Sequence, residues 1–119
     1  MIIALWIVNI VLALAFLAAG LTKAAQPKAK LAGTMGWVDD FASPSVKLIG
    51  IAEVVGALGL VLPLFARIAP VLAPIAAVCL AVLMAGAVVV HVRRTETFVP
   101  PLVLGLVSVA SAVLGFATL

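Results

Sequence analysis

Four long apolar blocks constrain this chain more than any other feature of its sequence. Each is about 20 residues long, enough for a helix to cross a hydrocarbon core about 30 Å thick. The chain is 67% hydrophobic and only 9% charged, which excludes an ordinary soluble domain. Because backbone groups in lipid must pair within their own segment, the blocks are predicted to be α-helices. We place these helices at residues 2–22, 45–64, 70–91 and 100–118.

The predicted fold class is therefore all-α: an integral membrane four-helix bundle that forms one transmembrane domain over residues 1–119. Of the 7 lysines and arginines, only Arg67 lies in the second connection, and the others flank the first and third. By the positive-inside rule, the first and third connections are cytoplasmic and both termini lie outside. We expect a multi-pass protein of the cytoplasmic membrane whose partner is the lipid bilayer and not a nucleic acid. The flanking cations are Lys23, Lys28, Lys30, Lys47, Arg93 and Arg94.

The first connection, residues 24–43, is long for so small a protein and mixes apolar with charged residues. Such a mixture is typical of a short helix lying in the membrane interface. Two roles are open for it: an anchor that sets the tilt of its neighbours, or a lid folded over the mouth of the bundle.

One carboxylate, Glu53, interrupts the second block near its middle. If this helix starts near Pro44, Glu53 lies about 12 to 14 Å from its cytoplasmic end. Charge at that depth costs about 2.5 to 3.5 kcal/mol on insertion scales, so we expect Glu53 to face the bundle, either protonated or paired with a cation. Most of its neighbours on the same helix face are small and allow another helix to approach closely: Ile49, Gly50, Gly56 and Ala57.

Three further polar residues are candidates for the same site. Asn9 lies about 12 Å from the outer end of the first block and can meet Glu53 if their faces agree. Lys23 ends the same helix stripe, and either snorkels to the surface or turns inward toward a carboxylate or an anionic ligand. His91 lies one turn inside the cytoplasmic end of the third block, either as an interfacial residue or as part of the site.

Other residue types indicate less chemistry. One histidine and one buried acid fall short of a zinc ligand set, so we predict no metal site. The single cysteine, Cys79, cannot form a disulfide within one chain and is expected to be a small buried residue. Glu96 is interpreted as a solvated partner of the neighbouring arginines, and the fourth block as scaffolding. Gly56 and Gly59 serve either packing within the bundle or the face of a homo-oligomer.

Several motifs together resemble the DoxX-like family of small bacterial membrane proteins. They are GLTK at 20–23, MGW at 35–37, KLIGIAEVVGALGLVLP at 47–63, PVLAPIAA at 70–77 and HVRRTE at 91–96. The resemblance implies a four-helix membrane bundle and a shared pocket at Lys23, Glu53, His91 and Glu96. It also implies a link to membrane oxidoreductases, since the namesake of the family is associated with a thiosulfate:quinone oxidoreductase. A more distant similarity is to sterol isomerase-like proteins that hold lipophilic ligands against buried acids.

These observations predict a protein that binds a lipophilic, oxygen-bearing ligand such as a quinone in a polar intramembrane pocket. In this prediction Glu53 is the central acid or hydrogen-bond donor. Lys23 and His91 lie at the entrance of the pocket, and Asn9 orients Glu53 from the side away from the entrance. The chain has no cofactor motif of its own and would serve a redox partner protein. Two alternatives are open: an isomerase- or cyclase-like enzyme using Glu53 and His91 in acid/base chemistry on a lipid or terpenoid, and a non-catalytic assembly subunit.

Overall fold

The computed structural model describes residues 2–26 and 43–119, and these form four helices. The helices are α1 (Ile2–Ala25), α3 (Ser43–Ala66), α4 (Leu72–Arg93) and α5 (Val99–Thr118). All four are long and apolar enough to cross a membrane. The predicted all-α membrane bundle is thereby confirmed. The predicted interfacial helix of the first connection falls outside the described residues.

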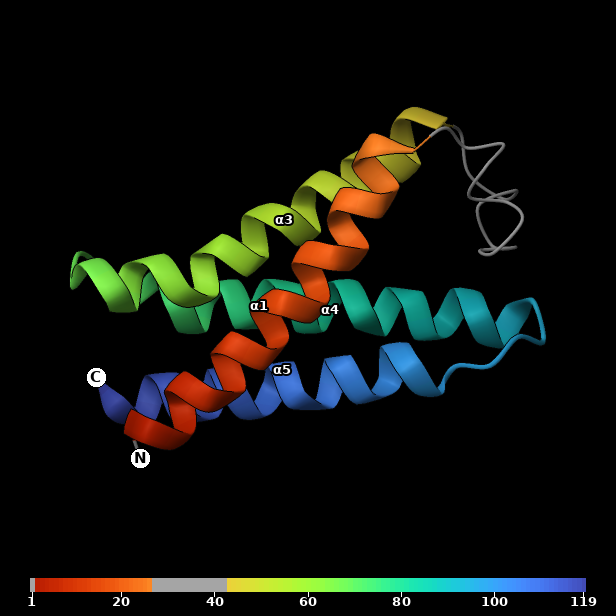
Figure 1. The fold of residues 1–119 in the computed structure, drawn as a ribbon. Helices are drawn as coiled ribbons and strands as arrows, with labels where there is room; N and C mark the ends of the chain where they lie inside the picture. The colour runs from red at the N-terminus through yellow and green to blue at the C-terminus, as the bar shows by residue number, and fades with distance from the viewer. Residues whose placement is uncertain (1, 27–42) are drawn as a thin grey trace.

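The bundle consists of two antiparallel helix pairs, α1 with α3 and α4 with α5, and α3 also packs on α4 (Figure 1). Both termini and the turn between α3 and α4 lie at one end, which we call the terminal end. The end of α1, the start of α3 and the turn between α4 and α5 lie at the other, which we call the basic end because it carries Lys23, Lys47, Arg93 and Arg94.

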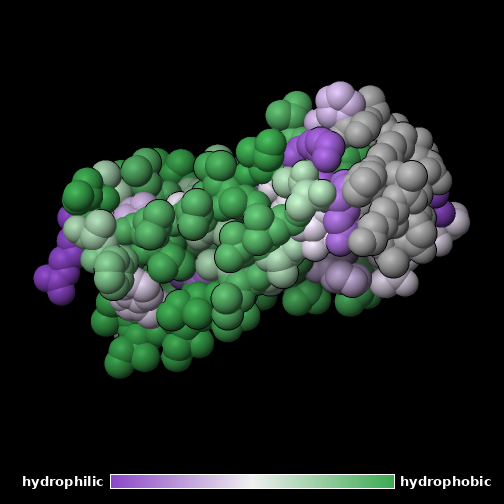
Figure 2. Space-filling model, turned by 45° about the horizontal axis from the view of Figure 1, so that its top comes forward, coloured by the Kyte–Doolittle hydropathy of each residue, from purple (hydrophilic) through white to green (hydrophobic). Residues whose placement is uncertain are grey.

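The surface between the two ends is apolar. Figure 2 shows hydrophobic residues covering the middle of the molecule and hydrophilic residues gathered toward its ends. Such a band is what a lipid-facing surface requires. Cys79 lies in this exposed surface, so the expectation that it is buried is wrong. Its neighbour Leu80 faces the core, and successive helix residues point about 100° apart.

The first two helices each bury one narrow stripe with a spacing of three or four residues. The stripe of α1 begins at Leu5 and ends at Lys23. The core between the helices is built from apolar side chains of all four, including Leu12, Phe16, Leu60, Leu80 and Ala112.

The close contact between α1 and α3 depends on two glycines. A Cβ atom added to Gly20 would lie 2.6 Å from the carbonyl oxygen of Gly50, and one added to Gly50 would lie 2.7 Å from the carbonyl oxygen of Gly20. The two backbones therefore touch where the helices cross, which brings the half of α1 at the basic end against the face of α3 that carries Glu53.

Two other glycines of α3 bring α4 close. An added Cβ would lie 2.6 Å from Leu80 at Gly56 and 2.9 Å from Ala76 at Gly59. Both glycines thus pack within the bundle, which was one of the two roles considered for them.

Candidate functional site

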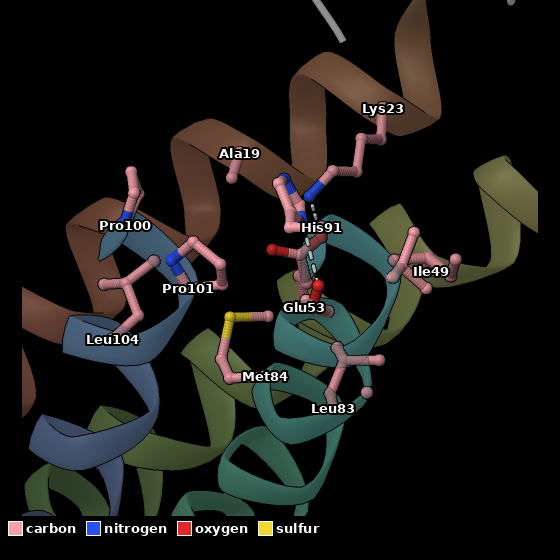
Figure 3. A pocket seen from close by; sticks show the side chains of 13 residues that line it. Ala19, Lys23, Ile49, Glu53, Leu83, Met84, His91, Pro100, Pro101 and Leu104 are labelled. Atoms are coloured by element: carbon pink, nitrogen blue, oxygen red, sulfur yellow. Dashed lines mark hydrogen bonds and ion pairs between the residues drawn. The ribbon is translucent and has the colours of Figure 1, made fainter. Parts of the chain in front are cut away.

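A cavity of about 420 Å³ lies among the four helices at the basic end. Every helix contributes to its wall, and Figure 3 shows the side chains that line it. The wall is apolar apart from three side chains, Lys23, Glu53 and His91. Its volume is in the range of small-molecule sites, and an apolar wall with a few convergent polar groups is typical of them.

The polar centre of the cavity is an ion pair between α1 and α3. Lys23 Nζ donates to Glu53 Oε1 at 2.5 Å, and the two side chains are only 11% and 1% exposed. Lys23 therefore turns inward, the second of the two orientations considered for it, and Glu53 faces the bundle as predicted. Figure 3 shows the pair joined across the cavity wall.

His91 lies on the α4 side of the same cavity (Figure 3). Its Nδ1 atom is 2.7 Å from the carbonyl oxygen of Ala87. Because a carbonyl oxygen only accepts, Nδ1 carries the proton, and a neutral ring then leaves Nε2 as an acceptor for a ligand. Among the described residues no hydrogen bond joins His91 to Glu53, so a ligand can lie between them.

The backbone just after His91 is held in a capping motif. The amide of Glu96 donates to the carbonyl of His91 at 2.9 Å, and that of Thr95 donates to Val92 at 3.1 Å. Thr95 has a φ of 56°, so these bonds form the Schellman arrangement that closes a helix C-terminus. Glu96 also pairs with Arg94 at 3.2 Å, as predicted. The motif fixes the end of α4 that carries the imidazole.

Asn9 is not part of the cavity wall. Its Nδ2 atom donates to the carbonyl oxygen of Leu60 at 2.9 Å, and its Oδ1 atom accepts from the Ser111 hydroxyl. The structure therefore does not bring Asn9 to Glu53; it places Asn9 in a separate polar contact that joins α1, α3 and α5.

The antiparallel packing of α1 and α3 explains this difference. The helices cross where Gly20 meets Gly50, so a residue well before Gly20 faces one equally far beyond Gly50. Leu60 fits that position for Asn9, and Glu53 lies about 10 Å nearer the crossing, from the rise per residue. The distance of each residue from the end of its own helix does not reveal which residues of the two helices face each other.

The fourth block was expected to be scaffolding only, but α5 also contributes to the cavity wall and to the contact of Asn9. Pro100, Pro101 and Leu104 line the cavity opposite α3, and Ser111 supplies the hydroxyl bonded to Asn9. A signal for the inward face of α5 was available in the spacing of its small residues. The buried ones are Ser108, Ser111, Ala112 and Gly115.

The cavity offers one cationic donor, one carboxylate and one imidazole against an apolar wall. This set can hold a carbonyl or hydroxyl oxygen and can exchange a proton with it. In the part of the chain that the structure describes, no three histidine, cysteine, aspartate or glutamate side chains are grouped to hold a metal ion.

Comparison with known proteins identifies the family. No curated protein and no solved structure matches the chain. The DoxX-like family matches over residues 7–114, which include all the residues that line the cavity. Because this match covers most of the sequence, the chain belongs to the DoxX-like family.

Proposed function

We propose that this membrane protein binds a lipophilic molecule bearing carbonyl or hydroxyl oxygens in the cavity at the basic end, and that a quinone is the favoured class. The observation that carries the proposal is the buried pair of Lys23 and Glu53 in the wall of an otherwise apolar cavity. Ionisable side chains inside membrane helices are costly, and they commonly mark ligand or ion sites.

In this molecule, a polar contact that only joins helices lies away from the cavity. Asn9 and Ser111 are fully buried, bond to each other and do not line the cavity. Lys23 and Glu53 also join two helices, but they border about 420 Å³ of space. This contrast favours ligand binding over a purely structural role for the ion pair.

The donors and acceptors suit both redox forms of a quinone. The ammonium of Lys23 can donate to a quinone carbonyl, while Glu53 and the Nε2 atom of His91 can accept from a quinol hydroxyl. In this proposal the chain supplies the quinone site, and a partner protein of a membrane redox system supplies or removes the electrons.

A second candidate function is acid/base catalysis on a lipid or terpenoid. It is favoured by one observation: Glu53 and His91, two groups able to transfer protons, line the same cavity. Here Glu53→Gln would retain binding of the substrate and lose turnover, because the amide cannot transfer the proton.

Thermal unfolding of the purified protein in detergent tests the proposal. Added decylubiquinone should raise the unfolding temperature of the wild type, because a ligand that binds only the folded state stabilises it. Glu53→Gln should reduce this shift. The matched control is Glu96→Gln, which makes the same change in the Arg94 pair outside the cavity and should keep the full shift. Absence of a shift in the wild type would contradict quinone binding.

A further inference from the structure

We propose that the cavity opens sideways into the bilayer through a window between α3 and α4 at Gly86, and that this window holds the hydrocarbon tail of the ligand. The inference rests on the proposed function and adds to it. It specifies that the ligand carries a long tail and that the tail leaves the cavity within the membrane.

Gly86 combines two properties that place an opening beside it. It lines the cavity and is itself exposed. A Cβ atom added there meets no heavy atom within 4 Å, whereas one added to any of the glycines of α1, α3 and α5 would lie within 3.2 Å of a neighbour. The cavity wall therefore reaches the molecular surface at this residue.

The packing of α3 and α4 explains why the window lies at this level. Toward the terminal end the two helices are in close contact, at Gly56 with Leu80 and at Gly59 with Ala76. Toward the basic end they diverge, as Figure 1 shows. Ile49 from α3 and Leu83 from α4, both half-buried, then lie on the same side of Glu53 and border the gap (Figure 3).

The depth of the window is that of lipid chains. Gly86 lies five residues before His91 and seven before the end of α4 at Arg93, which is about 7 to 10 Å along the helix. The exposed side chains around it on α4 are apolar, including Val82 and Val89. A group that passes through the window therefore enters hydrocarbon and not water.

The depth of the cavity suits the head group of the ligand but not its tail. From His91 at the mouth to Met84 at the floor is about 10 Å along α4. That depth suits a ring held by Lys23, Glu53 and His91, and leaves a long alkyl or isoprenoid tail without room unless it exits.

The test compares two probes with one ring, decylubiquinone and its tailless parent quinone, binding to the full chain in the same detergent. The wild type should bind the decyl compound at least about tenfold more tightly, because its tail gains packing contacts with the apolar side chains that border the window. Gly86→Phe should weaken binding of the decyl compound far more than binding of the tailless quinone, and so remove this preference. Ala85→Phe, on the adjacent exposed residue that does not line this cavity, should retain it.

Four results would overturn the window. Equal wild-type affinity for both probes, or an unchanged preference in Gly86→Phe, would contradict it while the proposed function stands. Equal weakening of both probes by Gly86→Phe would assign Gly86 to the head group. If the wild type binds neither probe, the proposed function fails and the window with it. Gly86→Leu is the second variant if Gly86→Phe does not fold, judged by far-UV circular dichroism and gel filtration.

Discussion

At the scale of single residues, the pairing of Lys23 with Glu53 decides what the cavity can do. Both charges are withdrawn from water and lipid by the crossing of α1 over α3. The attraction between buried charges barely offsets their desolvation, so such a pair contributes little net stability while either member alone is strongly destabilising. Stability alone therefore does not account for the pair, in keeping with the ligand role that we propose for it.

This balance gives the first prediction. Lys23→Met leaves Glu53 buried without its partner and should lower the free energy of unfolding by about 3 kcal/mol. The double variant Lys23→Met, Glu53→Met should recover most of that loss, because it removes both charges. Reversible unfolding in mixed micelles measures the three proteins. If the double variant is as unstable as Lys23→Met, the ion pair itself stabilises the fold.

A second residue-scale prediction concerns Thr95. A β-branched residue with a φ of 56° is strained, and glycine is the usual residue at this position of a Schellman motif. Thr95→Gly should therefore raise the free energy of unfolding by about 0.5 to 1 kcal/mol. Thr97→Gly, in the same turn but not at positive φ, should give no gain. Equal effects of the two changes would show that the capping motif is not strained.

At the scale of elements, glycines determine how closely the helices approach one another. The space beside the Cα atom differs from one glycine to the next. Gly50→Ala would place a methyl group 2.7 Å from backbone atoms of α1 and should destabilise the protein by about 1 to 3 kcal/mol. Gly86→Ala adds the same group where nothing lies within 4 Å and should be neutral or slightly stabilising. Thermal unfolding of the two variants in one detergent decides the point. Similar losses in both would contradict the described crossing.

Much of this architecture could be predicted from the sequence, because the membrane restricts the backbone so strongly. Runs of apolar residues bounded by prolines and cations predicted four helices close to those observed. The small residues around Glu53 predicted its inward face. The orientation of Lys23 could not be decided, because snorkelling and inward pairing suit the same helix position and differ only in whether Glu53 is within reach.

The contacts of Asn9 show where prediction from sequence ends. Its depth suggested a meeting with Glu53, but the crossing point of α1 and α3 selects Leu60 and Ser111 as its partners. Crossing points depend on which small residues meet across a helix pair, and a single helix does not specify its partner's register. For the same reason the share of α5 in the cavity wall went unpredicted.

At the scale of the whole molecule, the cations gather at the end that holds the cavity. Since both termini and Arg67 lie at the other end, the positive-inside rule predicts that the cavity faces the cytoplasm. In a Cys79→Ala background, the thiol of Thr95→Cys should react with a membrane-impermeant maleimide only after the cells are opened. The thiol of Ile68→Cys should react in intact cells. The opposite pattern would reverse the orientation.

The central claim is that the cavity holds a lipophilic, oxygen-bearing ligand, and mass spectrometry of organic extracts from the purified protein tests it most directly. We expect a quinone to accompany the wild type and Glu96→Gln in amounts comparable to the protein. The same quinone should be depleted in a folded Glu53→Gln variant. Extracts of the wild type that repeatedly contain no quinone or other oxygen-bearing lipophile beyond the level in Glu53→Gln would contradict the account.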